Sequence, residues 1–468
     1  MTLAQSPAGR SPAAGRSAGT FASLLVWLVW GVTLASILVA IARHGRNIPF
    51  EEDWLMVAPM TGHEPDIPRW LWSQNSEHRL PMPKLVNLAV LRATGDFRAT
   101  MVFDTLALGA VAAAMILVAR ALRGKRTSLA DAFFPLLLLQ LGNWDNLVWA
   151  WQIQFVLPTV LACVLLLVIV ARPAPPTGVP LLAGALALVC LPLSGANGLI
   201  FTPTLAAWLA YAAWGRHRFS AGAGRTGLRL GAAAAVVAGV LCGVYFIGYQ
   251  PSPWNEPSPG LGATLATAGK FLAQSLGPAA VKWWLLFGTV VSLVLLGSLG
   301  TLVAAWRRSG DERGERVRIA GLVAFLVAAG MLTLAVGWGR AGHVVATGRI
   351  ATRYVLLGGP GLCAAYFSLL LYGEGRLGRA APAGLALLVA LLFPANTRIG
   401  FERRDWFGAG MAAFERDLAA GDSPEALAQR HHAFLLHWDE EMMVTEMKML
   451  HAAGIGPFVR LAGAPPGP

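Results

Sequence analysis

The amino-acid sequence predicts an all-α integral membrane protein with about eleven transmembrane helices. Hydrophobic residues make up 56% of the 468-residue chain and charged residues only 13%, and the mean hydropathy is +0.57. A chain with so few charged side chains cannot cover a water-soluble surface. The apolar residues also fall in long runs, and about 20 mostly apolar residues suffice for a helix to cross a bilayer.

Apolar runs in eleven places are candidates for transmembrane helices, and the third and fifth are short. They cover residues 21–43, 99–120, 129–142, 155–172, 179–194, 198–215, 229–249, 283–306, 317–338, 353–373 and 380–396. The Ser-, Ala- and Gly-rich residues 1–20 before them are expected to be a disordered cytoplasmic N-terminus. The first run is longer than the apolar part of a signal peptide, so we expect an uncleaved helix.

The distribution of Arg and Lys predicts the orientation, because cytoplasmic loops are enriched in these residues. With the N-terminus inside, the short inner segments carry Arg10, Arg16, Arg120, Arg123, Lys125, Arg126, Arg172, Arg216, Arg218, Arg225, Arg229, Arg307, Arg308, Arg313, Arg316, Arg318, Arg376 and Arg379. An odd number of spans then places the C-terminus outside. We therefore expect a multi-pass protein of the bacterial inner membrane, part of the cell envelope, with its C-terminus in the periplasm.

Three regions follow from this topology. Residues 21–396 form a polytopic transmembrane domain, whose first periplasmic loop, residues 44–98, is large. Residues 397–468 form a periplasmic helical segment, in which Ser423 is suited to cap a helix, Pro424 to begin it and Gly454 to stop it. His431, His432 and His437 in this segment could be metal ligands, but no carboxylate spacing completes a recognised site, so no metal is expected.

Other functional classes are disfavoured by the positions of the charges and cysteines. The net charge of +12 does not indicate nucleic-acid binding, because no basic run is interleaved with exposed aromatic residues in a soluble module. The four cysteines, Cys163, Cys190, Cys242 and Cys363, all lie in apolar runs. They are expected to be core residues and not disulfide or metal-site cysteines.

The first periplasmic loop opens with the consecutive acids Glu51, Glu52 and Asp53, which follow the first apolar run directly. A second polar group, over residues 69–87, includes the candidate binding residues His78, Arg79 and Lys84. An interfacial loop with solvated charges and a belt of Trp side chains is the alternative.

A second cluster lies between two spans on the same side, in the sequence "LGNWDNLVWAWQIQF" over residues 141–155. Amide side chains bond sugar hydroxyls and indole rings stack on sugar faces, so this pattern suits carbohydrate recognition. A Trp-rich interfacial turn explains it equally well. The candidate residues are Asn143, Trp144, Asp145, Asn146, Trp149 and Gln152.

A third cluster, over residues 337–354, places several basic residues at a periplasmic span entrance, where the positive-inside rule makes them unexpected. Guanidinium groups match phosphate geometry, although Arg side chains reaching lipid headgroups are the alternative. The candidate residues are Arg340, His343, Arg349, Arg353 and Tyr354.

These clusters together resemble the C-type polytopic membrane glycosyltransferase superfamily, which includes protein O-mannosyltransferases and aminoarabinose transferases. The resemblance covers the architecture of most of the chain and the short motifs "EEDW", "EHR", "NWDNLVWAWQ" and "GIGPF". The usual pair of acids after the first span is replaced by Glu51-Glu52-Asp53, which leaves the catalytic position open among them.

The resemblance implies an enzyme that moves a sugar, with inversion, from a polyprenyl-phosphate donor to a hydroxyl of a glycan, lipid or protein acceptor. The leaving group is already a phosphate anion, so one carboxylate base and cations for the phosphate suffice. Asp53, or else Glu52, would be the base, and Arg349 and Arg353 would hold the phosphate. No cofactor is expected to be required, although Glu51-Glu52-Asp53 could bind a divalent cation weakly.

Two other membrane functions remain open from the sequence. A multi-pass transporter or flippase of a lipid-linked saccharide would place ionisable residues near the bilayer midplane. The polar residues gather instead at the periplasmic interface, which favours an enzyme. A glycan ligase or polymerase would share that interface.

Overall fold

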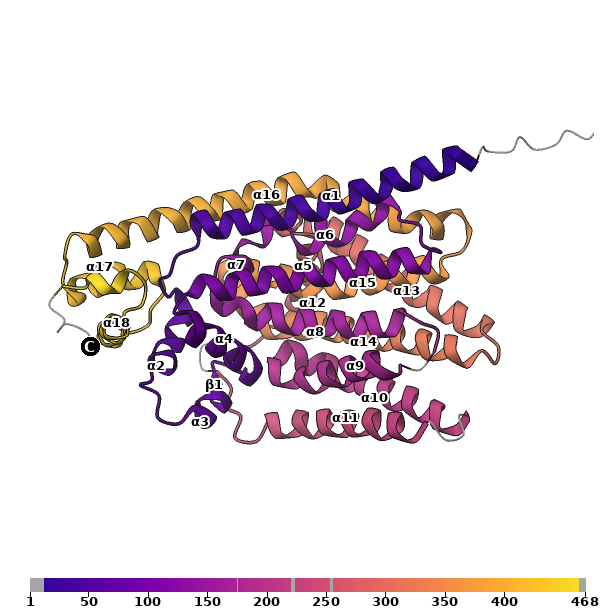
Figure 1. Cartoon of the computed structure of the whole chain (residues 1–468), viewed down its shortest axis with the longest axis horizontal. Coiled ribbons are helices and arrows are strands. Elements are labelled where there is room, and N and C mark those ends of the chain that lie inside the picture. Colours follow the sequence, from indigo (N-terminus) through magenta and orange to yellow (C-terminus); the bar gives the residue numbers. More distant parts are fainter. Residues whose placement is uncertain (1–11, 175, 220–223, 253–255, 463–468) are drawn as a thin grey trace, which may run out of the picture.

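A computed structural model of the chain describes residues 12–174, 176–219, 224–252 and 256–462 (Figure 1). Among these residues, eight helices are long and apolar enough to cross a membrane. They are α1 (Pro12–His44), α5 (Phe97–Leu122), α8 (Ile153–Val170), α11 (Gly224–Tyr245), α13 (Trp284–Arg308), α14 (Arg313–Thr347), α15 (Val355–Tyr372) and α16 (Gly375–Ala419). The protein is therefore an all-α, multi-pass membrane protein, as the composition predicts.

The predicted count of eleven spans is not confirmed, because three of the predicted runs differ from a plain transmembrane helix. The run 129–142 is broken into η2 (Leu129–Ala132), α6 (Phe133–Leu138) and η3 (Leu141–Asn143). The run 179–194 contains α9 (Gly178–Cys190), which has only 13 residues, followed by η5 (Pro192–Ser194). The run 198–215 lies in α10 (Ala196–Phe219), which contains Pro203 and several polar residues.

Helix α1 begins at Pro12, inside the segment 1–20 that the sequence predicts to be disordered. Residues 12–20 are Ala-rich, and alanine has the highest helix propensity, while proline is well placed in a first helical turn. The helix that the first span requires therefore extends backwards into this segment. Residues 1–11 lie outside the described part of the chain.

Helix α12 (Leu261–Gln274) is an element that the sequence reading did not assign to any span. After it, the chain doubles back through η6 (Pro278–Trp283) to the start of α13. A Cβ atom on Gly269 would lie 2.9 Å from the ring of Trp284, and one on Gly288 would lie 2.5 Å from the carbonyl oxygen of Gly269. These close approaches bring α12 against the first turns of α13.

Short elements cover one end of the helix bundle. The 44–98 loop forms η1 (Glu51–Met56), α2 (Val57–Met60), α3 (Ile67–Trp72), a hairpin of β1 (Gln74–Asn75) and β2 (His78–Arg79), and α4 (Pro81–Thr94). The two strands pair antiparallel, with Gln74 opposite Arg79. The tail forms α17 (Pro424–Leu435), α18 (Glu440–Ala452) and η8 (Gly456–Arg460). Both groups lie at the left end in Figure 1, whereas α1 begins at the right end.

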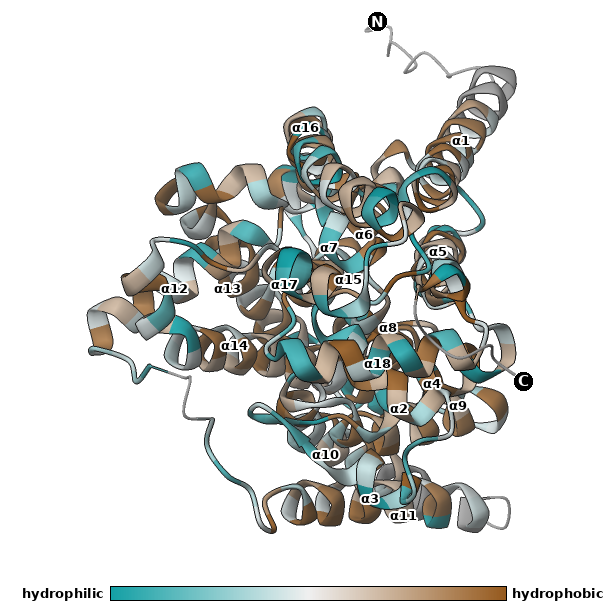
Figure 2. Cartoon of the chain, turned by 90° about the vertical axis from the view of Figure 1, so that its left-hand side faces the viewer, coloured by the Kyte–Doolittle hydropathy of each residue, from teal (hydrophilic) through white to brown (hydrophobic). Residues whose placement is uncertain are grey.

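The tail follows the expected local signals. The hydroxyl of Ser423 accepts a hydrogen bond from the amide of Ala426 at 3.2 Å, and Pro424 begins α17. Gly454 follows α18 with a φ of +68°, a left-handed conformation that suits a helix stop. Seen from this end, α17 and α18 carry many hydrophilic residues (Figure 2). The two tail helices and the first loop therefore form a polar cap over the bundle.

The tail is packed directly on the acidic start of the first loop. Trp54, which is fully buried, has its ring centroid 5.2 Å from that of His437 and 6.4 Å from that of Phe458. The ring centroids of Phe50 and Phe434 lie 5.9 Å apart. Aromatic contacts of this kind join segments almost 400 residues apart and hold η1 between the bundle and the tail.

Candidate functional site

The three polar clusters that the sequence predicts meet at the covered end of the bundle. The amide of Trp151 donates to the carboxylate of Asp53 at 2.7 Å, which joins η4 (Ala150–Gln152) to η1. The side-chain amide of Asn146, in α7 (Trp144–Leu147), donates to the carbonyl oxygen of Arg353 at 2.8 Å. Arg353 lies in η7 (Thr352–Tyr354), and its guanidinium lies 3.9 Å from the carboxylate of Glu51.

Asp53 is held by the backbone and faces inward. It is 1% exposed, and its second carboxylate oxygen accepts the amide of Phe50 at 3.3 Å. Burial raises the pKa of Asp53 well above its ordinary value, although the two amide donors oppose this shift. With one oxygen on each of two backbone amides, this carboxylate fastens η1 to η4.

Glu52 is the neighbouring acid with the environment of a general base. Burial, together with the nearby charge of Glu51, raises the pKa of Glu52 to about 7. One of its carboxylate oxygens is buried and accepts no hydrogen bond from the described residues. Glu51 has a φ of +49°, which is uncommon for a residue other than glycine. Such backbone conformations are more frequent at functional sites than elsewhere.

Arg353 is the cation nearest to these acids. Its guanidinium lies over the ring of Trp149, with 5.9 Å between the guanidinium carbon and the ring centroid. Its positive charge acts on Glu51 and Glu52, and lowers the pKa of each against the effect of burial. Arg353 therefore stabilises the charged form of two carboxylates. Its side chain is 31% exposed, which leaves area for contact with a further anion.

A second charged group lies beside the first. Arg340 forms an ion pair with Glu77, which also lies 3.6 Å from the imidazole of His78. Burial lowers the pKa of His78 to about 4, so this imidazole is neutral at pH 7. The guanidinium of Arg340 also lies 5.9 Å from the ring centroid of Tyr354.

This second group forms the polar end of a cavity of about 270 Å³. Glu77, His78, Arg340 and Tyr354 lie at the polar end. The remaining walls are mainly apolar and come from α8, α10, α14 and the end of α11 with the residues just after it. They include Phe155, Leu199, Ile200, Phe246, Leu332, Ala335 and Val336. A polar head at the end of an apolar hollow between helices suits an amphipathic ligand.

Most of the 143–152 cluster is buried among neighbouring elements. Trp144, Trp149 and Trp151 are at most 5% exposed. Several polar atoms here make no hydrogen bond with the described residues, including both amide atoms of Gln152. Unpartnered buried polar atoms are rare in folded proteins, and such a concentration indicates a place for water or ligand.

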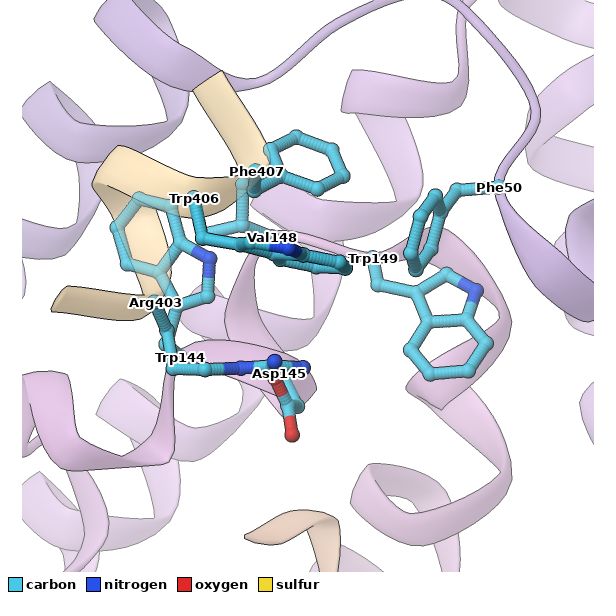
Figure 3. Close-up of a pocket in the computed structure, with 8 residues that line it drawn as sticks. All are labelled: Phe50, Trp144, Asp145, Val148, Trp149, Arg403, Trp406 and Phe407. Atoms are coloured by element: carbon cyan, nitrogen blue, oxygen red, sulfur yellow. Dashed lines mark hydrogen bonds and ion pairs between the residues drawn. The ribbon is translucent and has the colours of Figure 1, made fainter. Parts of the chain in front are cut away.

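An aromatic-lined recess beside Glu51 contains a third ion pair (Figure 3). Asp145 lies 3.2 Å from the guanidinium of Arg403 and also accepts a hydrogen bond from Thr352. Figure 3 shows Phe50 and Trp149 on one side of the recess and Trp406 on the other. Its free volume is only about 10 Å³, room for about one water molecule, so in this conformation it does not admit a sugar ring.

Some predicted residues lie apart from this centre. Arg349 and His343 are exposed, and neither Arg349 nor Asp53 lines the cavity that contains Arg340. Arg79 and Lys84 are buried and bond backbone carbonyl oxygens of the first loop and of the segment after α11. The structure thus brings Arg353 to the acids, but it does not bring Asp53, Arg349 and Arg353 to one cavity.

Other residues of the site were not among the sequence-based candidates. Arg403, on α16, and the cavity residues Asn197 and Tyr245 come from distant helices. Nothing in their local sequence distinguishes them from other residues of apolar helices. Glu77 is different, because the sequence already places it with Asp53, His78 and Arg79 among the first-loop residues for which a function is favoured.

Comparisons of the chain with family models, with curated proteins and with solved structures found no match in any of the three. Among the residues that the structure describes, no three His, Cys, Asp or Glu side chains are placed to hold a metal ion. The tail histidines pair with separate acids: His431 with Asp417, His432 with Glu440 and His437 with Glu446.

Proposed function

We propose that the protein is a membrane glycosyltransferase that moves a sugar from a polyprenyl-phosphate donor to an acceptor hydroxyl at the covered end of the bundle. The observation that carries the proposal is that Glu52 and Arg353 lie within electrostatic range of Glu77 and His78 at the polar end of the amphipathic cavity, although neither Glu52 nor Arg353 lines the cavity itself. A base, two phosphate-binding cations and an apolar hollow are the parts that this reaction needs.

Glu52 takes the role of base in this proposal. A base works best when its pKa lies near the working pH, and the pKa of Glu52 is about 7. Each oxygen of Asp53 already accepts a backbone amide, from Phe50 or Trp151, whereas one oxygen of Glu52 accepts no hydrogen bond from the described residues. The glutamate would remove the proton of the acceptor hydroxyl as the oxygen attacks the sugar carbon.

Arg353 and Arg340 supply the positive charge for the departing polyprenyl phosphate. An arginine guanidinium can bind two phosphate oxygens at once in a bidentate contact, and partial burial strengthens this contact. Each guanidinium already faces a carboxylate, Glu51 or Glu77, and lies over an aromatic ring. These contacts orient the arginines before the donor arrives. A single displacement inverts the configuration of the sugar.

The apolar walls of the cavity would receive the first isoprene units of the donor. They belong to α8, α10, α11 and α14, of which α8, α11 and α14 are long and apolar enough to cross the membrane. Transfer of an isoprene chain from water to an apolar environment lowers its free energy, and transfer from lipid into an apolar groove changes its free energy little.

The test measures polyprenyl phosphate released by the purified full-length protein in lipid nanodiscs. A panel of polyprenyl-phosphate sugars is supplied with a cell-envelope extract as the source of acceptor. We expect Glu52→Gln and Arg353→Gln each to lower release at least about 100-fold, the usual order for loss of a base or a charge stabiliser. Glu415→Gln and Arg398→Gln, charge-matched changes on α16, are the controls.

The proposal is wrong if Glu52→Gln and Arg353→Gln release polyprenyl phosphate at the wild-type rate while the wild type is active. A flippase of a lipid-linked saccharide is the second candidate, because the broken segment 129–152 and the buried polar atoms of Gln152 resemble features of transporters. Movement of intact donor across a sealed vesicle without release of polyprenyl phosphate would favour that function.

A further inference from the structure

Arg79 is a buried cation that no carboxylate balances among the residues that the structure describes. It is 7% exposed, and its guanidinium donates to the carbonyl oxygens of Tyr245 at 3.0 Å, Trp72 at 2.8 Å and Ile247 at 2.9 Å. A guanidinium has five N–H groups, so two remain. The nearest acid on its hairpin, Glu77, is already paired with Arg340 and His78.

Lys84 repeats this pattern next to Arg79. It is 2% exposed, and its ammonium donates to the carbonyl oxygens of Trp70 and Ser73 and to the hydroxyl of Ser73, each at 2.9 Å. Burial and the nearby charge of Arg79 lower the pKa of Lys84 to about 8. No ion pair involving either cation occurs among the described residues. Buried charges without an opposite charge are costly, so this region favours an anion.

Arg79 lines a hollow of about 500 Å³ on the polar cap. The other lining comes from Gln74 and Ser76 of the hairpin and from the segment 248–252. No acidic residue of the described part of the chain lines this hollow. Both figures place α3, which leads into the hairpin, beside the end of α11, which leads into that segment. The same Arg79 bonds to Tyr245, which lines the neighbouring amphipathic cavity.

We propose that this hollow is an anion-binding site, in which Arg79 holds a phosphate or carboxylate group of a hydrophilic ligand. The two remaining N–H groups of Arg79 supply the contact, and the bound anion balances the charges of Arg79 and Lys84. The amides and hydroxyls of the lining bond the polar remainder of the ligand. A lipid tail has no place in this hollow, because its lining is polar.

For a transferase, this site takes the acceptor, which would therefore be an acidic saccharide or a phosphorylated one. This assignment of the ligand as acceptor rests on the proposed function. Anion binding itself does not, because it is measured on the resting protein without donor.

The experiment leaves Arg79 in place, because its three carbonyl contacts make the hairpin depend on it. Ser76 lines the hollow, is exposed and has a φ of +49°, which aspartate and asparagine tolerate better than most residues. Ser76→Asp adds a negative charge at the rim, and Ser76→Asn has nearly the same shape without the charge. Binding of inorganic phosphate, glucose 6-phosphate, glucuronate and glucose to the full-length protein in nanodiscs is measured by calorimetry.

We expect the wild type and Ser76→Asn to bind phosphate saturably, and Ser76→Asp to bind it at least about tenfold more weakly. Tighter binding of glucose 6-phosphate than of glucuronate identifies a phosphate ligand, and the reverse order identifies a carboxylate ligand. Three results would each overturn the anion site. The first is equal affinity for glucose and the two anionic sugars, and the second is the absence of phosphate binding. The third is equal phosphate affinity in Ser76→Asp and Ser76→Asn. The Glu52→Gln variant should bind phosphate with the affinity of the wild type while it loses sugar transfer. This result would separate the anion site from the proposed reaction centre.

Discussion

Three consecutive acids have three different environments because of the local backbone. Glu51, Glu52 and Asp53 lie in the first turn of η1, a helix with about three residues per turn, so their side chains point about 120° apart. Glu51 faces Arg353, Glu52 is acted on by the charges of Glu51, Arg353 and Glu77, and Asp53 faces the amide of Trp151. At the residue scale, the proposed function depends on this difference in direction.

The raised pKa of Glu52 predicts a pH dependence for the proposed reaction. A base acts when ionised, so transfer should rise as pH increases through about 7 and level off above it. The folded protein also binds more protons than the unfolded chain between about 4.5 and 7, so stability falls as pH rises through this window. We therefore expect Glu52→Gln to be more stable than the wild type at pH 8, by on the order of 2 kcal/mol.

Rates and melting temperatures over pH 5–9, measured on the same nanodisc preparation, check both parts. A rate that is flat across pH 7 would contradict the assignment of Glu52. Equal melting temperatures of the wild type and Glu52→Gln at pH 8 would contradict its desolvation.

The Asp53→Asn variant distinguishes the role of Asp53 from that of Glu52 by its effects on stability and on transfer. Asparagine keeps one oxygen as an acceptor but loses the second, so one backbone amide of Phe50 or Trp151 is left without its partner. We expect a loss of about 1–3 kcal/mol in the free energy of unfolding, with transfer per folded molecule within about threefold of the wild type. A loss of transfer comparable to that of Glu52→Gln, at an unchanged melting temperature, would restore Asp53 as the base.

At the element scale, close packing of α16 on the broken segment fixes the site. A Cβ atom on Gly400 would lie 2.2 Å from the carbonyl oxygen of Leu141, and one on Gly142 would lie 2.9 Å from Asn396. Only glycine permits these approaches. They set the path of residues 141–152, which carry the amide of Trp151 and the ring of Trp149.

Gly400→Ala should therefore destabilise the protein by roughly 2 kcal/mol or more and lower transfer, since either α16 or η3 must move. Gly408→Ala, on the same helix, is the matched control because a Cβ there meets nothing within 4 Å. It should be neutral or stabilising by up to about 1 kcal/mol, the helix-propensity difference between alanine and glycine. Similar melting temperatures of the two variants would contradict the packing described for Gly400.

At the scale of the whole molecule, the polar site and both polar segments share one end of the bundle, and α1 begins at the other end. The positive-inside rule predicts that the covered end is periplasmic. Pro65→Cys, on the first loop, should react with a membrane-impermeant thiol reagent in intact cells. Asp311→Cys, between α13 and α14, should react only after permeabilisation. The opposite pattern would reverse the orientation, and labelling of both in intact cells would contradict the topology.

The sequence by itself determined the properties that depend on local or summed composition. The long apolar runs imply a membrane protein because the bilayer length sets the helix length, and Ser423 and Pro424 mark the start of α17 because capping is local. The clustering of polar groups in residues 44–98, 143–152 and 337–354 was likewise visible, although their mutual contacts were not.

Only the tertiary structure decided which of these residues meet. The sequence could not distinguish Glu52 from Asp53, because their difference lies in the amide of Trp151, about 100 residues away. Nor could it find the cavity walls or Arg403, since apolar residues occur on all of the long helices and arginines on several of them. Burial, and with it the pKa of Glu52 and the unbalanced charge of Arg79, is a property of packed neighbours, which no stretch of sequence contains.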